Sequence, residues 1–144
     1  MQPKKFALYG GIVMLAMGLL ALIMPGPVEF LPYLTVDASY GLFLGIFPMN
    51  IMNKLALIGF GIAGIAVSRR LSADPSVQYS RVVFAVMGLL AILGLIPQTN
   101  TLNGIWPLFG AEIWAHAIFA VLGAYFGFAT SARTSMSKRT APGH

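Results

Sequence analysis

The sequence contains no cysteine and few charged residues. The lack of cysteine excludes disulfide bonds, thiolate metal sites and cysteine nucleophiles, although it does not indicate a cellular compartment. Charged residues make up 9% of the chain, whereas a soluble domain has about a quarter. Hydrophobic residues make up 58%, which leaves too little polar surface for a water-soluble globule. The composition therefore predicts an integral membrane protein.

Four apolar runs are long enough, or nearly long enough, to cross a bilayer. They cover about residues 6–24, 49–68, 80–96 and 112–132. The third run is short, so we expect it to take in residues from 77–80 as well. The first run follows a basic leader and could be a signal peptide, but no small-residue cleavage site ends it. We therefore interpret residues 6–132 as a four-span, all-α membrane domain.

The polar segments outside this domain are short. Residues 1–5 form a basic leader, and residues 133–144 form a basic tail that we expect to be disordered. Within the domain, Asp74 and Pro75 predict a turn in the polar link between the second and third spans.

Basic residues indicate the orientation of the chain. Eight of the nine lysines and arginines lie before the first span, between the second and third spans, or after the fourth span. This clustering at span ends argues against nucleic-acid binding. By the positive-inside rule it places both termini in the cytoplasm of a multi-pass protein. We expect the bacterial cytoplasmic (inner) membrane or its photosynthetic extension.

Two matches within the chain indicate an internal repeat. Residues 17–21 recur as residues 87–91, and residues 47–61 align with residues 109–123 at an offset of 62. The chain therefore reads as two two-span units in the same orientation, related by an axis along the membrane normal. The predicted fold is a four-helix membrane bundle built from these two parallel-oriented repeats.

The spans carry small residues where helices can approach closely. The residues predicted to pack in this way are Gly59, Ala63, Gly88, Ala91, Gly123 and Gly127. The spacing Gly59-x-Gly61-x-x-Gly64 also matches the dinucleotide-binding fingerprint. That fingerprint requires a preceding strand and a later acidic residue, so its position inside an apolar span argues against nucleotide binding.

The connection of residues 25–48 is rich in aromatic and aliphatic residues. One interpretation is a segment that lies along the membrane interface. The alternative is a docking surface for a partner protein. Three aromatic residues are predicted to be anchors at the membrane interface: Tyr40, Trp106 and Trp114.

The starts of the second and fourth spans are polar in the same way. The residues concerned are Asn50, Asn53, Lys54, Glu112 and His116. Lys54 is either an interfacial lysine whose ammonium reaches the headgroups or the partner of Glu112 in the other repeat. The group is either a hydrogen-bonded cluster joining the repeats or an ion or ligand site. His116 alone makes no metal site, because the other histidine, His144, lies in the tail.

Three stretches resemble a known family: residues 47–50, 107–116 and 124–128. They are similar to a bacterial family of small four-span membrane proteins classed as a domain of unknown function, found in cyanobacteria, proteobacteria and actinobacteria. The resemblance covers about residues 6–128. It implies an asparagine and then two histidines at the start of the second span. Here the histidine positions hold Asn53 and Leu57, while the histidine of the fourth span is kept as His116. The resemblance implies the architecture and no activity.

These features predict a non-enzymatic accessory or structural subunit that packs against a larger membrane complex, for example a photosynthetic or respiratory one, or against itself. The alternative is a small transporter, channel or sensor with an outward-facing site around Lys54, Glu112 and His116. No nucleophile–base pair suggests an enzyme. No cofactor or metal is predicted, while bound lipid or pigment between the spans is compatible with either hypothesis.

Overall fold

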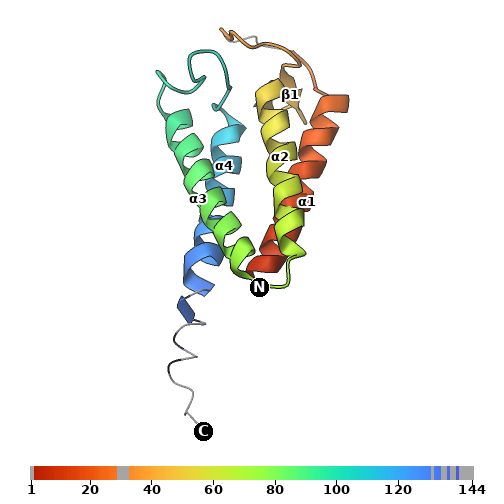
Figure 1. The fold of residues 1–144 in the computed structure, drawn as a ribbon. Coiled ribbons are helices and arrows are strands. Elements are labelled where there is room, and N and C mark those ends of the chain that lie inside the picture. The colour runs from red at the N-terminus through yellow and green to blue at the C-terminus, as the bar shows by residue number, and fades with distance from the viewer. Residues whose placement is uncertain (1, 29–32, 131, 134–135, 137–138, 140–144) are drawn as a thin grey trace.

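The computed structural model describes residues 2–28, 33–130, 132–133, 136 and 139. Within them, the chain forms helices α1 (Pro3–Ile23), α2 (Ile51–Ser68), α3 (Asp74–Leu95) and α4 (Ala111–Ala124), and α4 continues as the π-helix η1 (Tyr125–Ala129). Two short strands, β1 (Gly41–Phe43) and β2 (Phe47–Met49), lie before α2 (Figure 1).

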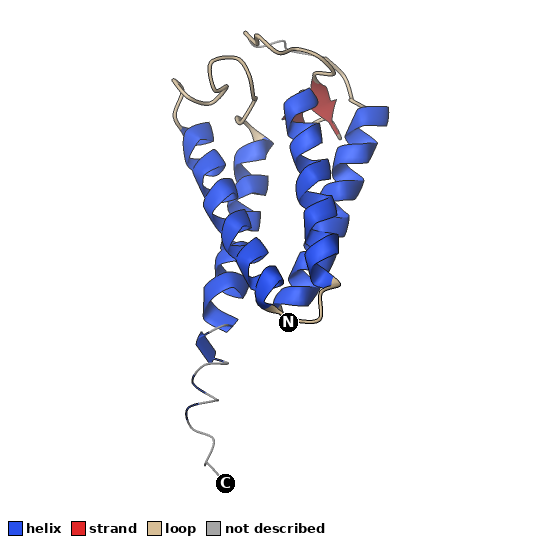
Figure 2. Ribbon diagram, in the orientation of Figure 1, coloured by secondary structure: helices blue, strands red, loops and turns tan. Residues whose placement is uncertain are grey.

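The four helices are long and apolar enough to cross a membrane, with η1 included in the fourth. Many of their large apolar side chains are exposed, such as Leu19, Ile62 and Ile118. This is the surface expected of helices whose solvent is lipid. The prediction of a multi-pass four-helix membrane protein is confirmed. The N-terminus lies at the same end of the bundle as the α2–α3 link, and the hairpin lies at the other end (Figure 2).

Each repeat forms a closely packed helix pair, and glycine permits the close approach. A Cβ on Gly61 of α2 would lie 2.8 Å from the Gly11 carbonyl oxygen of α1. A Cβ on Gly123 of α4 would lie 2.7 Å from the Ser80 carbonyl oxygen of α3. Gly61 and Gly123 are equivalent at the offset of 62, so the two pairs pack through the same repeat position. Such close backbone contact is how helices associate where lipid removes the hydrophobic drive.

Only some of the residues predicted to pack between helices lie at helix contacts. Gly123 and Gly127 are buried, with Gly127 against Arg81. Ala91 is buried, and Gly88 is half-buried near Ala120. Gly59 and Ala63 are instead exposed, and a Cβ on Gly59 would meet nothing within 4 Å. The close contacts of α2 are made by Gly61 and Gly64, so the apparent nucleotide fingerprint is a helix-packing pattern.

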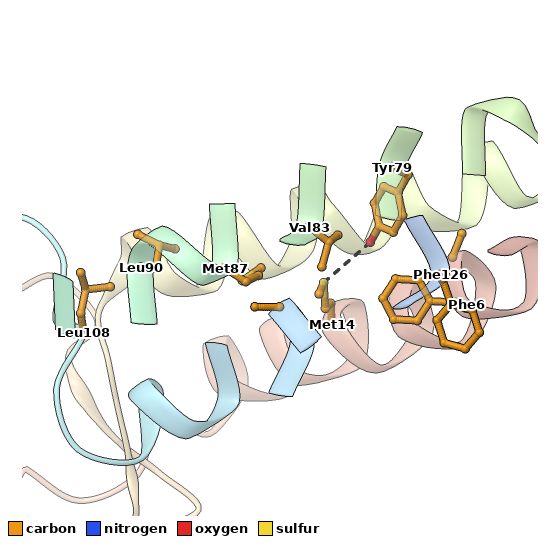
Figure 3. Packing of buried hydrophobic residues seen from close by; sticks show 10 residues of the cluster. Phe6, Met14, Tyr79, Val83, Met87, Leu90, Leu108 and Phe126 are labelled. Atoms are coloured by element: carbon orange, nitrogen blue, oxygen red, sulfur yellow. Dashed lines mark hydrogen bonds between the residues drawn. The ribbon is translucent and has the colours of Figure 1, made fainter. Parts of the chain in front are cut away.

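The main core lies between the two helix pairs, as Figure 3 shows. Near the end of the bundle that holds the N-terminus, Phe6 of α1 stacks on Phe126 of η1 with ring centroids 5.0 Å apart. The Tyr79 hydroxyl donates to the Phe60 carbonyl oxygen at 2.9 Å and lies 3.8 Å from the Met14 sulfur. These contacts join the repeats along their length, because Phe6 and Met14 come from the first repeat and Tyr79 and Phe126 from the second.

Some predicted boundaries were wrong. The third span starts at Asp74 rather than near residue 80, so Asp74 and Pro75 open α3 instead of forming a turn. Proline is tolerated in the first helical turn, because its missing N–H would have no intrahelical acceptor there. The first helix likewise starts at Pro3, inside the predicted basic leader. The predicted disorder of residues 133–144 falls mainly on residues outside the described part.

The β-hairpin was not predicted from the sequence. Its strands pair antiparallel, with Gly41 opposite Met49 and Phe43 opposite Phe47. Phe43 and Met49 are buried and form a second small core with Ala21. The connection is therefore partly folded onto the bundle and does not simply lie along the membrane interface. Residues 29–32, which belong to the same predicted segment, lie outside the described part.

Candidate functional site

Asn50 caps α2 and ties together the α1–α2 and α3–α4 connections, which lie at the hairpin end of the bundle and are called the outer connections because that end is away from the N-terminus. Its side-chain oxygen accepts from the backbone N–H groups of Met52 at 2.9 Å and Asn53 at 3.4 Å. Its amide nitrogen donates to the carbonyl oxygens of Val36 and Ile105, both at 2.8 Å. Asn50 is fully buried. It therefore satisfies two free N–H groups of the helix start and links the connections of both repeats.

Asn53 completes a capping box and reaches the second repeat. Its side-chain oxygen accepts from the Asn50 backbone N–H at 3.1 Å. Its amide nitrogen donates to the Pro107 carbonyl oxygen at 3.0 Å and to Glu112 Oε2 at 3.3 Å. A hydrogen-bonded cluster thus joins the repeats, with Asn53 as the bridge.

Lys54 is fully buried and has a different partner from the one considered in the sequence. Its Nζ donates to the side-chain oxygen of Ser39 at 2.8 Å and also to the Ser39 carbonyl oxygen. No ion pair joins it to Glu112 among the described residues. The ammonium therefore fastens the first outer connection to α2. Ser39, which the sequence did not single out, has a positive φ of 57°, and these bonds hold it in that conformation.

Glu112 and His116 face each other one turn apart on α4. Glu112 Oε2 lies 3.5 Å from His116 Nε2 and also accepts from Asn53. Both residues are buried, with 8% of His116 and 4% of Glu112 exposed. The other two polar atoms of this pair, Glu112 Oε1 and His116 Nδ1, have no hydrogen-bond partner within the described structure. Within the described structure only one polar atom of each side chain thus has a polar partner, which is unusual for buried polar groups.

A cavity of about 30 Å³ lies beside this pair. Its polar lining residues are Asn53, Trp106, Glu112 and His116, and its apolar lining includes Met17, Leu57, Met87 and Phe119. The lining comes from all four helices, β2 and the second outer connection. The cavity therefore lies at the seam between the repeats, near the hairpin end of the bundle.

The three predicted interface anchors occupy different environments. Trp114 is 71% exposed on α4, as an anchor requires. Tyr40 is buried instead, and burial raises the pKa of its phenol. The Trp106 indole lines the cavity, and its buried Nε1 has no partner in the described structure. Tyr40 is thus packed inside the structure and does not project outward as Trp114 does, whereas Trp106 is half-buried and its role as an anchor stays a prediction.

The family comparison agrees with this architecture. The model of a domain of unknown function (DUF4383) matches residues 4–129, which includes all four spans and the whole polar cluster. The chain belongs to this family. The resemblance drawn from the starts of the second and fourth spans is thereby confirmed. No curated protein and no solved structure matches the chain. Within the described part of this DUF4383 protein, no group of three or more histidine and acidic residues is placed to hold a metal ion.

Proposed function

We propose that this small membrane protein is a non-enzymatic accessory or structural subunit that docks on a larger membrane complex through the tip of its hairpin, residues 44–46. The observation behind the proposal is the exposure of two large apolar side chains at this tip. Leu44 is 72% exposed and Ile46 is 58% exposed. They project from the outer connection rather than from a membrane-spanning helix.

Leu44 is also in a backbone conformation that leucine disfavours. Its φ is 54°, followed by Gly45 at 76°. Hairpin turns with two such residues normally use asparagine, aspartate or glycine at the first position. A leucine in the left-handed region costs about 1–2 kcal/mol. An exposed apolar side chain gives no folding gain to offset this cost, so contact with a partner accounts for it better.

The hairpin is held firmly against the bundle. Its own residues Phe43 and Met49 are buried against Ala21 of α1, and the Ile51 N–H donates to the Ala38 carbonyl oxygen at 2.9 Å. Lys54 holds Ser39 from below. Because the tip is pre-organised by these contacts, a partner would bind it with little loss of conformational entropy.

The test is gentle detergent extraction from the native membrane, followed by a native gel and mass spectrometry of the band that contains the protein. We expect co-migration with a large complex in a fixed ratio. Leu44→Asn should release the protein from that band while leaving it folded, because asparagine suits the turn. The matched control is Asn103→Gly, which relieves a positive φ of 57° in the other connection and should leave the complex intact. Migration of the unaltered protein alone would refute the proposal.

The second candidate is a small transporter, channel or sensor. It is favoured by Glu112 Oε1 and His116 Nδ1, which have no hydrogen-bond partner within the described residues and belong to residues that line a cavity. Ionisable groups inside a membrane are often functional. Glu112→Gln separates the two candidates. A docked subunit should keep its complex with this substitution. A transporter, channel or sensor that uses Glu112 should migrate alone and lose its transport or sensing activity.

A further inference from the structure

Arg81 is an exposed arginine whose guanidinium is held in place by the neighbouring helix. It lies on α3, which packs against η1, the π-helix that continues α4. Its Nε donates to the Gly127 carbonyl oxygen at 2.8 Å. Its Cζ lies 5.0 Å from the centre of the Phe128 ring, which is within the range of a cation–π contact. Two contacts from one turn of η1 therefore fix the position of an exposed cation.

Arg81 also lies where the exposed surface of α3 changes from polar to apolar. The exposed residues before it on this helix are Asp74 and Gln78. The exposed residues after it begin with Val82 and Phe84 and are apolar as far as Leu95. The surface of a membrane helix changes in this way where hydrocarbon gives way to headgroups. Arg81 is therefore at the depth at which phospholipid phosphates lie.

The surface next to the Arg81 guanidinium is aromatic. Phe84 of α3 and Phe128 of η1 are both exposed, and their rings meet edge to face with centroids 5.7 Å apart. Phe128 thus contacts both Phe84 and Arg81, so a positive charge and an apolar surface adjoin each other. A soluble anion can use only the charge. A ligand with an anionic head and a hydrocarbon chain can use both.

The charges at this end of the bundle also favour an anionic ligand. It is the end that holds the N-terminus and the α2–α3 link, opposite the hairpin (Figure 2). In the described parts of the helix ends and the link, the one acidic residue here is Asp74, and the basic residues are Lys4, Lys5, Arg69, Arg70, Arg81 and Arg133. A basic surface at the end of membrane-spanning helices attracts anionic lipid.

We propose that Arg81, Phe84 and Phe128 form a binding site for one anionic phospholipid. The Arg81 Nη groups carry the other N–H donors of the guanidinium, in a planar fork that suits phosphate oxygens. The acyl chains lie along the exposed rings of Phe84 and Phe128. The lipid thereby covers the junction of α3 and η1 that Arg81 bridges. The site lies at the opposite end of the bundle from the hairpin, so it does not rest on the docking role.

The test is native mass spectrometry of the full chain, released from micelles that contain phosphatidylglycerol and phosphatidylcholine with identical acyl chains. We expect the unaltered chain to retain one phosphatidylglycerol in preference to phosphatidylcholine. Inorganic phosphate should displace this lipid no better than chloride at the same ionic strength, because it has no chains to contact Phe84 and Phe128. Equal retention of the two lipids would overturn the proposal. Displacement by inorganic phosphate would overturn it as well, because the site would then bind a soluble anion.

A pair of variants with the same charge change separates a specific site from general attraction. Arg81→Gln should lower the retention of phosphatidylglycerol by about tenfold, since hydrogen bonds to a charged group are lost. Arg70→Gln, in the exposed α2–α3 link, should lower it by less than about twofold, because salt screens a charge that does not touch the lipid. Equal losses would refute the site. If Arg81→Gln does not fold, Arg81→Lys replaces it. This variant keeps the charge and loses the planar fork, so it should still weaken retention more than Arg70→Gln does.

Discussion

The second helices of the two repeats start at equivalent positions but use their polar residues differently. Asn50 has each of its amide atoms in two hydrogen bonds within the chain. Glu112, its equivalent at the offset of 62, has bonds to one oxygen and none to the other within the described structure. The first repeat therefore uses this position for folding. The second leaves it partly open, beside a cavity.

The next pair of equivalent positions repeats this difference. Lys54 is committed to Ser39 and fastens a connection. His116 contacts only Glu112 with one ring nitrogen and leaves the other without a partner among the described residues. The two equivalent polar positions are thus fully hydrogen-bonded in the first repeat and only partly hydrogen-bonded, within the described residues, in the second. Comparing matched substitutions in the two copies tests this division.

The largest effect is expected at Asn50. Asn50→Ala removes a helix cap from a fully buried site and leaves the part-buried carbonyl groups of Val36 and Ile105 without their donor. It should therefore lower the free energy of unfolding by about 3 kcal/mol. The measurement is a denaturation titration in mixed micelles. Asn50→Ser is the matched control, because its hydroxyl oxygen keeps a cap acceptor and introduces no buried charge, while the bonds of the Asn50 amide nitrogen to Val36 and Ile105 are lost. A loss below about 1 kcal/mol for Asn50→Ala would contradict the structural role.

An intermediate effect is expected at the helix contacts, and here the repeats should behave alike. Gly61→Ala and Gly123→Ala each place a methyl group against a backbone oxygen, at 2.8 Å and 2.7 Å. Each should cost about 1–3 kcal/mol, as overpacking does. Gly59→Ala is the control, because its methyl group meets nothing and alanine favours a helix by about 0.5–1 kcal/mol. Equal effects at Gly59 and Gly61 would mean that α2 packs through a different face.

The smallest effect is expected at Glu112. Glu112→Gln keeps the shape of the side chain and an acceptor for Asn53, so the free energy of unfolding should change by less than about 1 kcal/mol. The same titration measures it beside Asn50→Ala. A loss as large as that of Asn50→Ala would show that Glu112 is also a folding residue, and the proposed difference between the repeats would disappear.

Much of the fold could be predicted from the sequence because lipid imposes strict local rules. A run of apolar residues must form a helix there, since the backbone has no other way to satisfy its polar groups. The four spans followed from that rule. The start of α3 was misplaced because Asp74 and Pro75 are favoured both in turns and in the first turn of a helix. The two residues alone therefore do not show which of these structures they form.

The candidate site was predicted in its members but not in its contacts. The five polar residues were recognisable because polar groups are costly inside a membrane. Ser39 and the carbonyl groups of Val36 and Ile105 carried no such signal, since any loop contains similar groups. Trp106 resembled an interface anchor, and its place at the cavity depends on a connection that folds back over the bundle.

The sequence by itself determined the class of the protein, its helices and the polar residues of the spans that needed partners. These features depend on hydrophobicity and on short-range conformational preferences. The tertiary structure decided which polar groups bond to each other and which glycines lie at contacts. Those outcomes depend on distances between segments far apart in the chain. Gly59 and Gly61 are two residues apart in one helix, yet one is exposed and the other touches α1. The rotation of α2 against α1 sets that difference, and the cavity beside Glu112 and His116 forms only where side chains of all four helices meet.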